Sequence, residues 1–165
     1  MNKTLLALIF GLVPLVAAAG GNHAGHDMQH SGMAGMHSEG HASAAGQPGE
    51  QAKVNRTIEV TMDDNMRFNP GLITVKAGET IRFFVKNVGK TQHEMVIGTA
   101  DELKEHAEMM RKMPGMQHAE PNMVTLAPGK RGGVVWQFSK AGQVDFACLI
   151  PGHMEAGMKG LITVE

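Results

Sequence analysis

The sequence predicts an all-β fold, a β-sandwich, preceded by a long polar segment. Two observations favour this fold. From residue 54 onward, apolar and polar residues alternate in short runs, and turn residues interrupt these runs at intervals of about 8 to 12 residues. The chain has 165 residues and a formal net charge of −1. This near-neutral balance gives no electrostatic basis for binding nucleic acid or an anionic membrane.

The strands are expected where the period-two alternation is clearest. They are residues 57–62, 72–75, 80–87, 93–97, 123–126, 133–139, 143–148 and 160–164. The turns between them contain Ala77-Gly78, Gly89-Lys90 and Pro128-Gly129. Many short strands with regular turn signals, and no internal repeat, are typical of one sandwich domain.

One helical insertion is expected near residues 100–113. Thr99 and Glu102 have the spacing of a capping box, which marks the start of a helix. Residues 103–113 favour helix, and Pro114-Gly115 ends it.

Histidine and methionine residues gather on this helix and in the loop after it. The group consists of His106, Met109, Met110, Met113, Met116, His118 and Met123. The first four have the spacing i, i+3, i+4 and i+7, so they share one helix face. Two interpretations stay open. The methionines, together with Leu103, pack on the sandwich as ordinary core, or the thioethers and imidazoles form a second, soft copper site.

The first 19 residues have the pattern of a secretory signal peptide. Lys3 precedes an apolar stretch from Leu5 to Val16, and Ala17 to Ala19 form a small-residue cleavage site. The apolar stretch is short for a membrane-spanning helix, although an uncleaved anchor is the alternative. We therefore expect an exported protein without a membrane attachment after cleavage.

Residues 20–53 form a low-complexity segment of Gly, Ala, Ser, His and Met. It has too few large apolar residues to bury a core, so we expect it to be disordered. Its possible ligands are His23, His26, Met28, His30, Met33, Met36, His37 and His41. Interleaved imidazoles and thioethers suit copper, and we interpret the segment as a metal-binding tail. The alternative is a solvating linker.

The clearest chemical motif lies near the C-terminus. Cys148 is the only cysteine, and His153 and Met158 follow it at intervals of five residues. Two imidazoles, one thiolate and a weak axial thioether form a redox-active copper site. In an exported protein, metal ligation also explains an unpaired cysteine. The second imidazole is expected from His93.

Some assignments around this motif have alternatives. His106 and His118 could replace His93, but both belong to the helical insertion. Met154 could compete for the axial position, although its neighbour His153 is already a ligand, so we expect Met154 at the apolar rim. Glu94 either supports the ligands or is an exposed charge.

From about residue 54 to the C-terminus, the chain resembles the cupredoxins, which are Greek-key β-sandwiches that hold a type 1 copper ion. In that family one histidine follows an upstream strand, and cysteine, histidine and methionine share the loop before the last strand. The resemblance implies that His93, Cys148, His153 and Met158 are the copper ligands. The pattern C-x4-H-x4-M has the spacing of rusticyanin.

The complete arrangement resembles the periplasmic CopI-type copper-tolerance proteins. It has a signal peptide at 1–19, a His/Met-rich tail at 20–53 and a cupredoxin domain at 54–165. The resemblance implies a periplasmic protein that captures, buffers or transfers copper as Cu(I) or Cu(II). The implied partners are copper ions and a periplasmic redox partner, copper exporter or copper oxidase. The alternative is a diffusible one-electron carrier. A multicopper enzyme is not expected, because the sequence has no His-x-His pair and is long enough for one such domain only.

Overall fold

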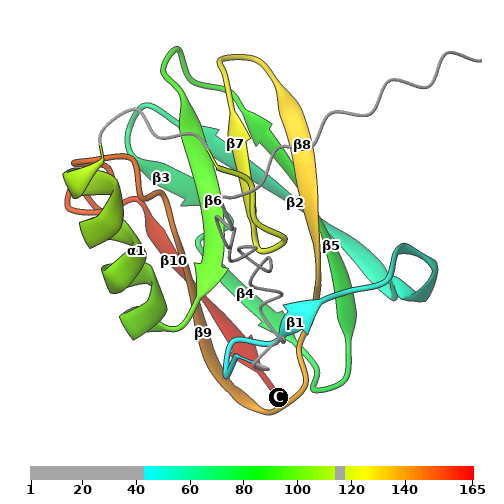
Figure 1. Cartoon of the computed structure of the whole chain (residues 1–165). Helices are drawn as coiled ribbons and strands as arrows, with labels where there is room; N and C mark the ends of the chain where they lie inside the picture. Colours follow the sequence, from blue (N-terminus) through cyan, green and yellow to red (C-terminus); the bar gives the residue numbers. More distant parts are fainter. Residues whose placement is uncertain (1–42, 114–117) are drawn as a thin grey trace, which may run out of the picture. The chain divides into compact units, whose positions relative to one another are not determined.

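Two sheets packed face to face, with one helix beside them, make up the domain (Figure 1). This computed structural model describes residues 43–113 and 118–165. The predicted signal peptide, and residues 20–42 of the predicted tail, lie outside the described residues. The predicted all-β sandwich with one helical insertion is confirmed.

Each sheet contains five strands. In spatial order, the first sheet has β1 (Gln47–Pro48), β8 (Arg131–Gln137), β5 (Thr80–Asn87), β2 (Arg56–Asp63) and β3 (Arg67–Asn69). The second has β4 (Leu72–Val75), β10 (Lys159–Val164), β9 (Gly142–Ala147), β6 (His93–Gly98) and β7 (Met123–Leu126). A 3-10 turn, η1, spans Gln51–Lys53. The pairs β2/β5 and β4/β10 are parallel, and the other pairs are antiparallel.

The core lies between the sheets and consists of inward-facing residues from both. Its largest fully buried side chains include Phe83, Phe138 and Phe146. Cys148 and Met158 belong to the same buried cluster, so two residues of the predicted copper motif are part of the hydrophobic core. The site is therefore fixed by the packing that stabilises the fold.

Strand β6 is buried along its whole length, although its sequence alternates only in part. Met95 and Ile97 face the core between the sheets. Val96 faces the other way and packs with Leu103 and Ala107 of the helix α1 (Ala100–Lys112). The helix thus covers the outer face of the strand that begins with His93.

Helix α1 begins with the predicted capping box. The Thr99 hydroxyl accepts from the Glu102 backbone N–H, and the Glu102 carboxylate accepts from the Thr99 N–H. The two buried residues of α1 are Leu103 and Ala107. Leu103 thus packs on the sandwich, as the core interpretation of this face expected, whereas Met109 and Met110 are half-buried and Met113 is exposed.

The domain also includes residues 43–53, which the sequence predicts as part of the tail. Strand β1 pairs with β8, the Gly49 N–H donates to the Val135 carbonyl, and Ala45 is buried. The Trp136 indole N–H donates to the Ala45 carbonyl at 2.8 Å. A two-residue strand leaves no periodic pattern in the sequence, and neither does the three-residue β3. Both were missed for this reason.

Within residues 43–113 and 118–165, no helix is long and apolar enough to cross a membrane.

We predict that Trp136→Phe loosens residues 43–53. The change leaves the buried Ala45 carbonyl without its donor and should lower the free energy of unfolding by about 1–3 kcal/mol. Denaturant unfolding measures the loss, and hydrogen exchange should show faster exchange around Ala45. Gln47→Ala removes an exposed hydrogen bond to Gln137 and serves as the control, with an effect within about 0.5 kcal/mol. Equal effects of the two changes would contradict the prediction.

Candidate metal centre

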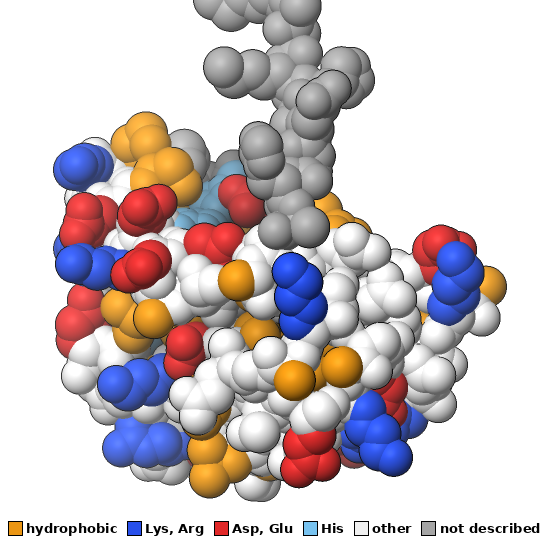
Figure 2. All heavy atoms as spheres, turned by 90° about the horizontal axis from the view of Figure 1, so that it is seen from below, with side chains coloured by type: hydrophobic (Ala, Val, Ile, Leu, Met, Phe, Trp, Pro, Cys, Tyr) orange, Lys and Arg blue, Asp and Glu red, His pale blue; other side chains and the backbone are white. Residues whose placement is uncertain are grey.

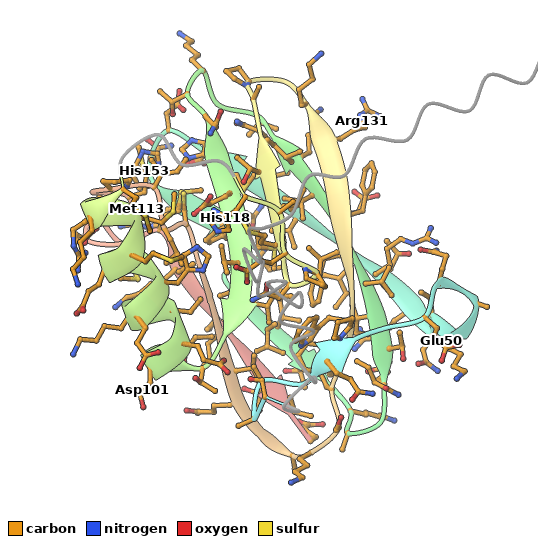
Figure 3. All side chains as sticks on the ribbon, in the orientation of Figure 1. Glu50, Asp101, Met113, His118, Arg131 and His153 are labelled. Carbon is orange, nitrogen blue, oxygen red and sulfur yellow. The ribbon has the colours of Figure 1, made fainter. Side chains whose placement is uncertain are left out.

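Three metal-binding side chains meet where the second sheet ends. His93 begins β6, and Cys148 directly follows β9. His153 lies in the loop before β10 (Figure 3). Their ligand atoms all lie within 4.8 Å of one another. His153 Nδ1 is 3.3 Å from both His93 Nδ1 and Cys148 Sγ. Nitrogens that share one ion at about 2.0 Å, with angles of about 100–120°, lie about 3.1–3.5 Å apart. The spacing and the donor types therefore fit a single copper ion.

Asp64 orients the His93 ring from the side opposite the cluster. His93 Nε2 lies 3.1 Å from Asp64 Oδ1 and 3.2 Å from Thr91 Oγ1. Because a carboxylate only accepts hydrogen bonds, we assign the ring hydrogen to Nε2. The Nδ1 lone pair then faces Cys148 and His153. A carboxylate behind a ligating imidazole fixes its tautomer and strengthens it as a donor.

The Asp64 carboxylate is itself held by the turn before β6. It accepts from the backbone N–H groups of Lys90 and Thr91 and from the Thr91 hydroxyl. Several hydrogen bonds hold the pKa of Asp64 far below its usual range, and the one from the Lys90 N–H has the largest effect. Asp64 therefore keeps its negative charge at every ordinary pH.

Cys148 is fully buried, and its sulfur accepts from the Glu94 backbone N–H at 3.4 Å. Burial raises the pKa of the thiol to about 12, against a smaller lowering effect of backbone N–H groups. In the metal-free protein the side chain is thus a neutral thiol at neutral pH. Metal ligation requires the thiolate, so binding must release this proton.

Backbone hydrogen bonds close the loop that carries Cys148, His153 and Met158. The Cys148 N–H donates to the Met158 carbonyl, and the Met158 N–H donates to the His153 carbonyl, both at 3.0 Å. Gly152 and Gly157 adopt φ values of 91° and 100°, a region that favours glycine. The loop therefore turns back on itself, and Met158 is fully buried at its end.

Glu94 supports the ligands, which decides between the two interpretations of this residue. It is only 3% exposed. Its Oε1 accepts from the Leu149 N–H at 2.9 Å, and its Oε2 accepts from the Thr125 hydroxyl at 3.3 Å. The residue after His93 thus binds the residue after Cys148 and fixes the two segments relative to each other.

Asn87 is a second support, and the sequence pattern does not predict it. Its side-chain amide donates to the carbonyls of Thr91 and Leu126 at 2.7 and 2.9 Å, and its oxygen accepts from the Gly89 N–H. It is fully buried and shapes the turn that leads into His93. Neither Asn87 nor Asp64 has a sequence signal for this role, because each is an ordinary polar residue at the end of a strand.

The structure keeps His106 and His118 apart from the first cluster. They pair with each other, with 2.7 Å between their Nε2 atoms, and they group with Glu120. The cluster of His93, Cys148 and His153 contains neither of them.

The predicted methionines lie in different environments. Met109 and Met110 are half-buried, Met113 is exposed, and Met123 is buried. Met154 packs against a small apolar cluster that includes Leu149. The remaining predicted ligands lie outside the described residues; they are His23, His26, Met28, His30, Met33, Met36, His37, His41 and Met116.

Comparison with protein families agrees with this geometry. Residues 52–165 match the family described as copper binding proteins, plastocyanin/azurin family. The chain therefore belongs to this family, the cupredoxins, and copper is its metal.

Relatives along the whole chain are more specific. The copper-resistant cuproprotein CopI of Rubrivivax gelatinosus is 48% identical over 99% of both chains. The protein of the same name from Vibrio cholerae is 38% identical over 96% of both chains. That from Pseudomonas aeruginosa is 37% identical over 81% of this chain and 90% of its own. The resemblance to CopI-type proteins is confirmed.

Solved structures with the same fold include the auracyanins. Reduced auracyanin of Roseiflexus castenholzii is 27% identical, with a TM-score of 0.58 over 68% of this chain and 98% of its own. Auracyanin B is 23% identical, with a TM-score of 0.60 over 73% of this chain and 96% of its own. At this identity the similarity supports the fold and nothing further.

We predict that Asp64→Asn weakens copper binding by about 10- to 100-fold, because the carboxylate behind His93 is lost. It should also raise the reduction potential, since a negative charge near the metal favours Cu(II). Competition titration and voltammetry measure these effects. Asp63→Asn removes the same charge one residue away, where the side chain accepts from the Asn65 N–H. Indistinguishable affinities for the two variants would show that Asp64 has no role at the metal.

We predict that copper affinity at the thiolate rises about tenfold per pH unit between about pH 7 and pH 9. The Cys148 thiol, with a pKa raised to about 12, must release one proton in this range. His153 contributes no proton there, because burial and the neighbouring His93 lower its pKa. Titration against a chelator, followed by the thiolate absorption, gives the slope. A flat response would mean that no thiol proton is displaced.

Proposed function

We propose that this protein contributes to copper tolerance by capturing copper at a mononuclear centre formed by His93, Cys148, His153 and Met158. The observation that carries the proposal is the convergence of two imidazole nitrogens and the Cys148 sulfur within 4.8 Å. The relatives at 37–48% identity are named copper-resistant cuproproteins, which supports the role in tolerance.

Each ligand has a distinct chemical task in this proposal. Cys148 gives a thiolate and the strongest bond, and the two imidazoles complete a trigonal set. Met158, buried at the end of the loop, would add a weak thioether ligand that favours Cu(I). Copper, when bound, supplies a one-electron couple. The donors are held in place before the metal arrives, so binding requires little reorganisation.

We further propose that the protein acts in the periplasm. The N-terminal pattern of residues 1–19 supports export, and residues 20–42 add histidine and methionine donors suited to copper. The ordered domain from residue 43 carries the thiolate centre. In this arrangement the tail collects copper, and the domain holds it for buffering or transfer to a periplasmic partner, such as an exporter or oxidase. We assign no catalytic reaction to the protein.

One-electron transfer is the second candidate function, and one observation favours it. His93, Cys148 and Met158 are fully buried, whereas His153 is half-buried and lies in the exposed turn with Pro151 and Gly152. A ligand that reaches the surface offers a path for electrons to a docked partner. The distinction between the two functions lies in how many copper ions the protein holds.

The test is an anaerobic copper titration of the mature protein, followed by visible absorption and bound-metal analysis. Copper capture predicts an intense thiolate band that saturates at about one equivalent, with further equivalents bound elsewhere. Saturation at one equivalent, with nothing beyond, would favour the electron carrier.

Cys148→Ser should abolish the thiolate band and leave the additional copper binding largely intact. In cells, this variant should restore copper tolerance less well than the wild-type protein. The matched control is Ser139→Ala, an exposed hydroxyl before the start of β9, at the opposite end of that strand from Cys148, which should change neither property. Full tolerance with Cys148→Ser would refute the proposed role of the centre.

A further inference from the structure

A second group of metal-binding side chains lies beside helix α1. It consists of His106 on α1 and His118 and Glu120 in the segment before β7, and their ligand atoms lie within 4.8 Å of one another. Figure 3 shows His118 between α1 and β6. Figure 2 shows histidine side chains recessed beside acidic side chains on one face of the domain.

The distances in this group are close to those of ligands that share one ion. The Nε2 atoms of His106 and His118 are 2.7 Å apart, and His118 Nε2 is 4.0 Å from Glu120 Oε1. Two ligands at about 2.0 Å from one ion, at an angle of about 90°, lie about 2.8 Å apart, so the two imidazole nitrogens have the separation of adjacent ligands. The Glu120 oxygen lies within 4.8 Å of both nitrogens, and its exposed side chain needs only a small shift to reach the same ion. Imidazole nitrogen and carboxylate oxygen are donors that suit Cu(II).

Hydrogen bonding satisfies this histidine pair only in part, because the 2.7 Å contact uses one nitrogen of each ring. His118 Nδ1 is buried without a hydrogen-bond partner, and it is the one such side-chain atom among residues 43–113 and 118–165. An imidazole kept only for structure normally has its buried nitrogens paired. In addition, the packing of α1 does not depend on the histidine pair, because Leu103 and Ala107 make the buried contact of the helix.

The group also has room and the right protonation state. His106 and Glu120 line a pocket of about 390 Å³, with Met109 in the same wall. His118 lines a neighbouring pocket of about 350 Å³ together with Met110 and Met123. Burial, followed by the proximity of His118, lowers the pKa of His106, so its ring is neutral and able to ligate at neutral pH.

We propose that His106, His118 and Glu120 form a second copper site, which binds Cu(II) through two imidazoles and one carboxylate. The site is separate from the thiolate centre and does not depend on its assignment. It differs from the soft thioether site that the sequence suggested, because the ligand group includes a carboxylate. The methionines line the adjoining pockets instead.

The second site lies next to the supports of the first. The pocket lined by His118 is also lined by Gln92 and Glu94, the residues on either side of His93. At the end of α1, Arg111 donates to Glu155 of the ligand loop at 3.1 Å. Copper at the second site is therefore held beside the thiolate centre, within the same ordered domain.

The first experiment is diffraction from crystals of the copper-loaded wild-type protein at the copper absorption edge. We expect an anomalous peak between the rings of His106 and His118, about 2 Å from each Nε2 atom. An occupied thiolate centre without a peak between these rings would overturn the proposal. Loading with an equal mixture of Cu(II) and Zn(II) tests the metal, and occupation by zinc alone would overturn the assignment to copper.

The second experiment measures the site in solution with the full mature chain. The variant His106→Gln/His118→Gln should bind about one Cu(II) fewer than the wild type and should lose one tetragonal Cu(II) signal in electron paramagnetic resonance. The tail is present in both proteins, so its copper cancels in the difference. An unchanged thiolate band in the variant shows that the domain is folded.

The carboxylate is tested in the same way. Glu120→Gln should weaken the second site by about 10- to 100-fold, whereas Glu108→Gln, an exposed position on α1, should leave it unchanged. Equal Cu(II) stoichiometry in the wild type and the double histidine variant would refute the site. Equal affinities for Glu120→Gln and Glu108→Gln would remove Glu120 from it.

Discussion

The hydrogen bonds of Glu94 join the two parts of the chain that carry the metal-binding side chains. Its backbone N–H donates to Cys148 Sγ, and its carboxylate accepts from the Leu149 N–H. The carboxylate is buried, and its burial without such hydrogen-bond partners would cost free energy of folding. Paired as it is, it continues the contact between β6 and the chain past the end of β9. Together with the packing of the core, this residue holds His93 and Cys148 in place relative to each other.

A site held this firmly suits both copper capture and electron transfer, because both gain from ligands that move little. The thiolate centre alone therefore does not distinguish the two functions. The two proposals differ in the donors outside it. The histidine pair beside α1 and the donors of residues 20–42 would serve a protein that holds several copper ions, and a simple carrier would not need them.

Much of the fold was predictable because its strands are long enough to show alternation, and α1 because Thr99 and Glu102 mark its start. The short β1 and β3 have too few residues to do so. Spacing predicted that Cys148 and His153 come together, since one loop carries both. The roles of Asp64, Asn87 and Glu94 depend on contacts across the sandwich, such as Asp64 with His93, 29 residues apart. Similarly, only the folded chain brings Glu120 to His106.

The last strand in the sequence, β10, lies between β4 and β9 in its sheet. The second sheet thus stays incomplete until the C-terminal residues are available, and pairing of this kind between distant segments is slow. Cys148 lies upstream of β10, so during synthesis its thiol emerges before the strand that completes its burial. Cys148 is therefore among the last core residues to be enclosed, and its thiol stays open to solvent until β10 pairs with β9.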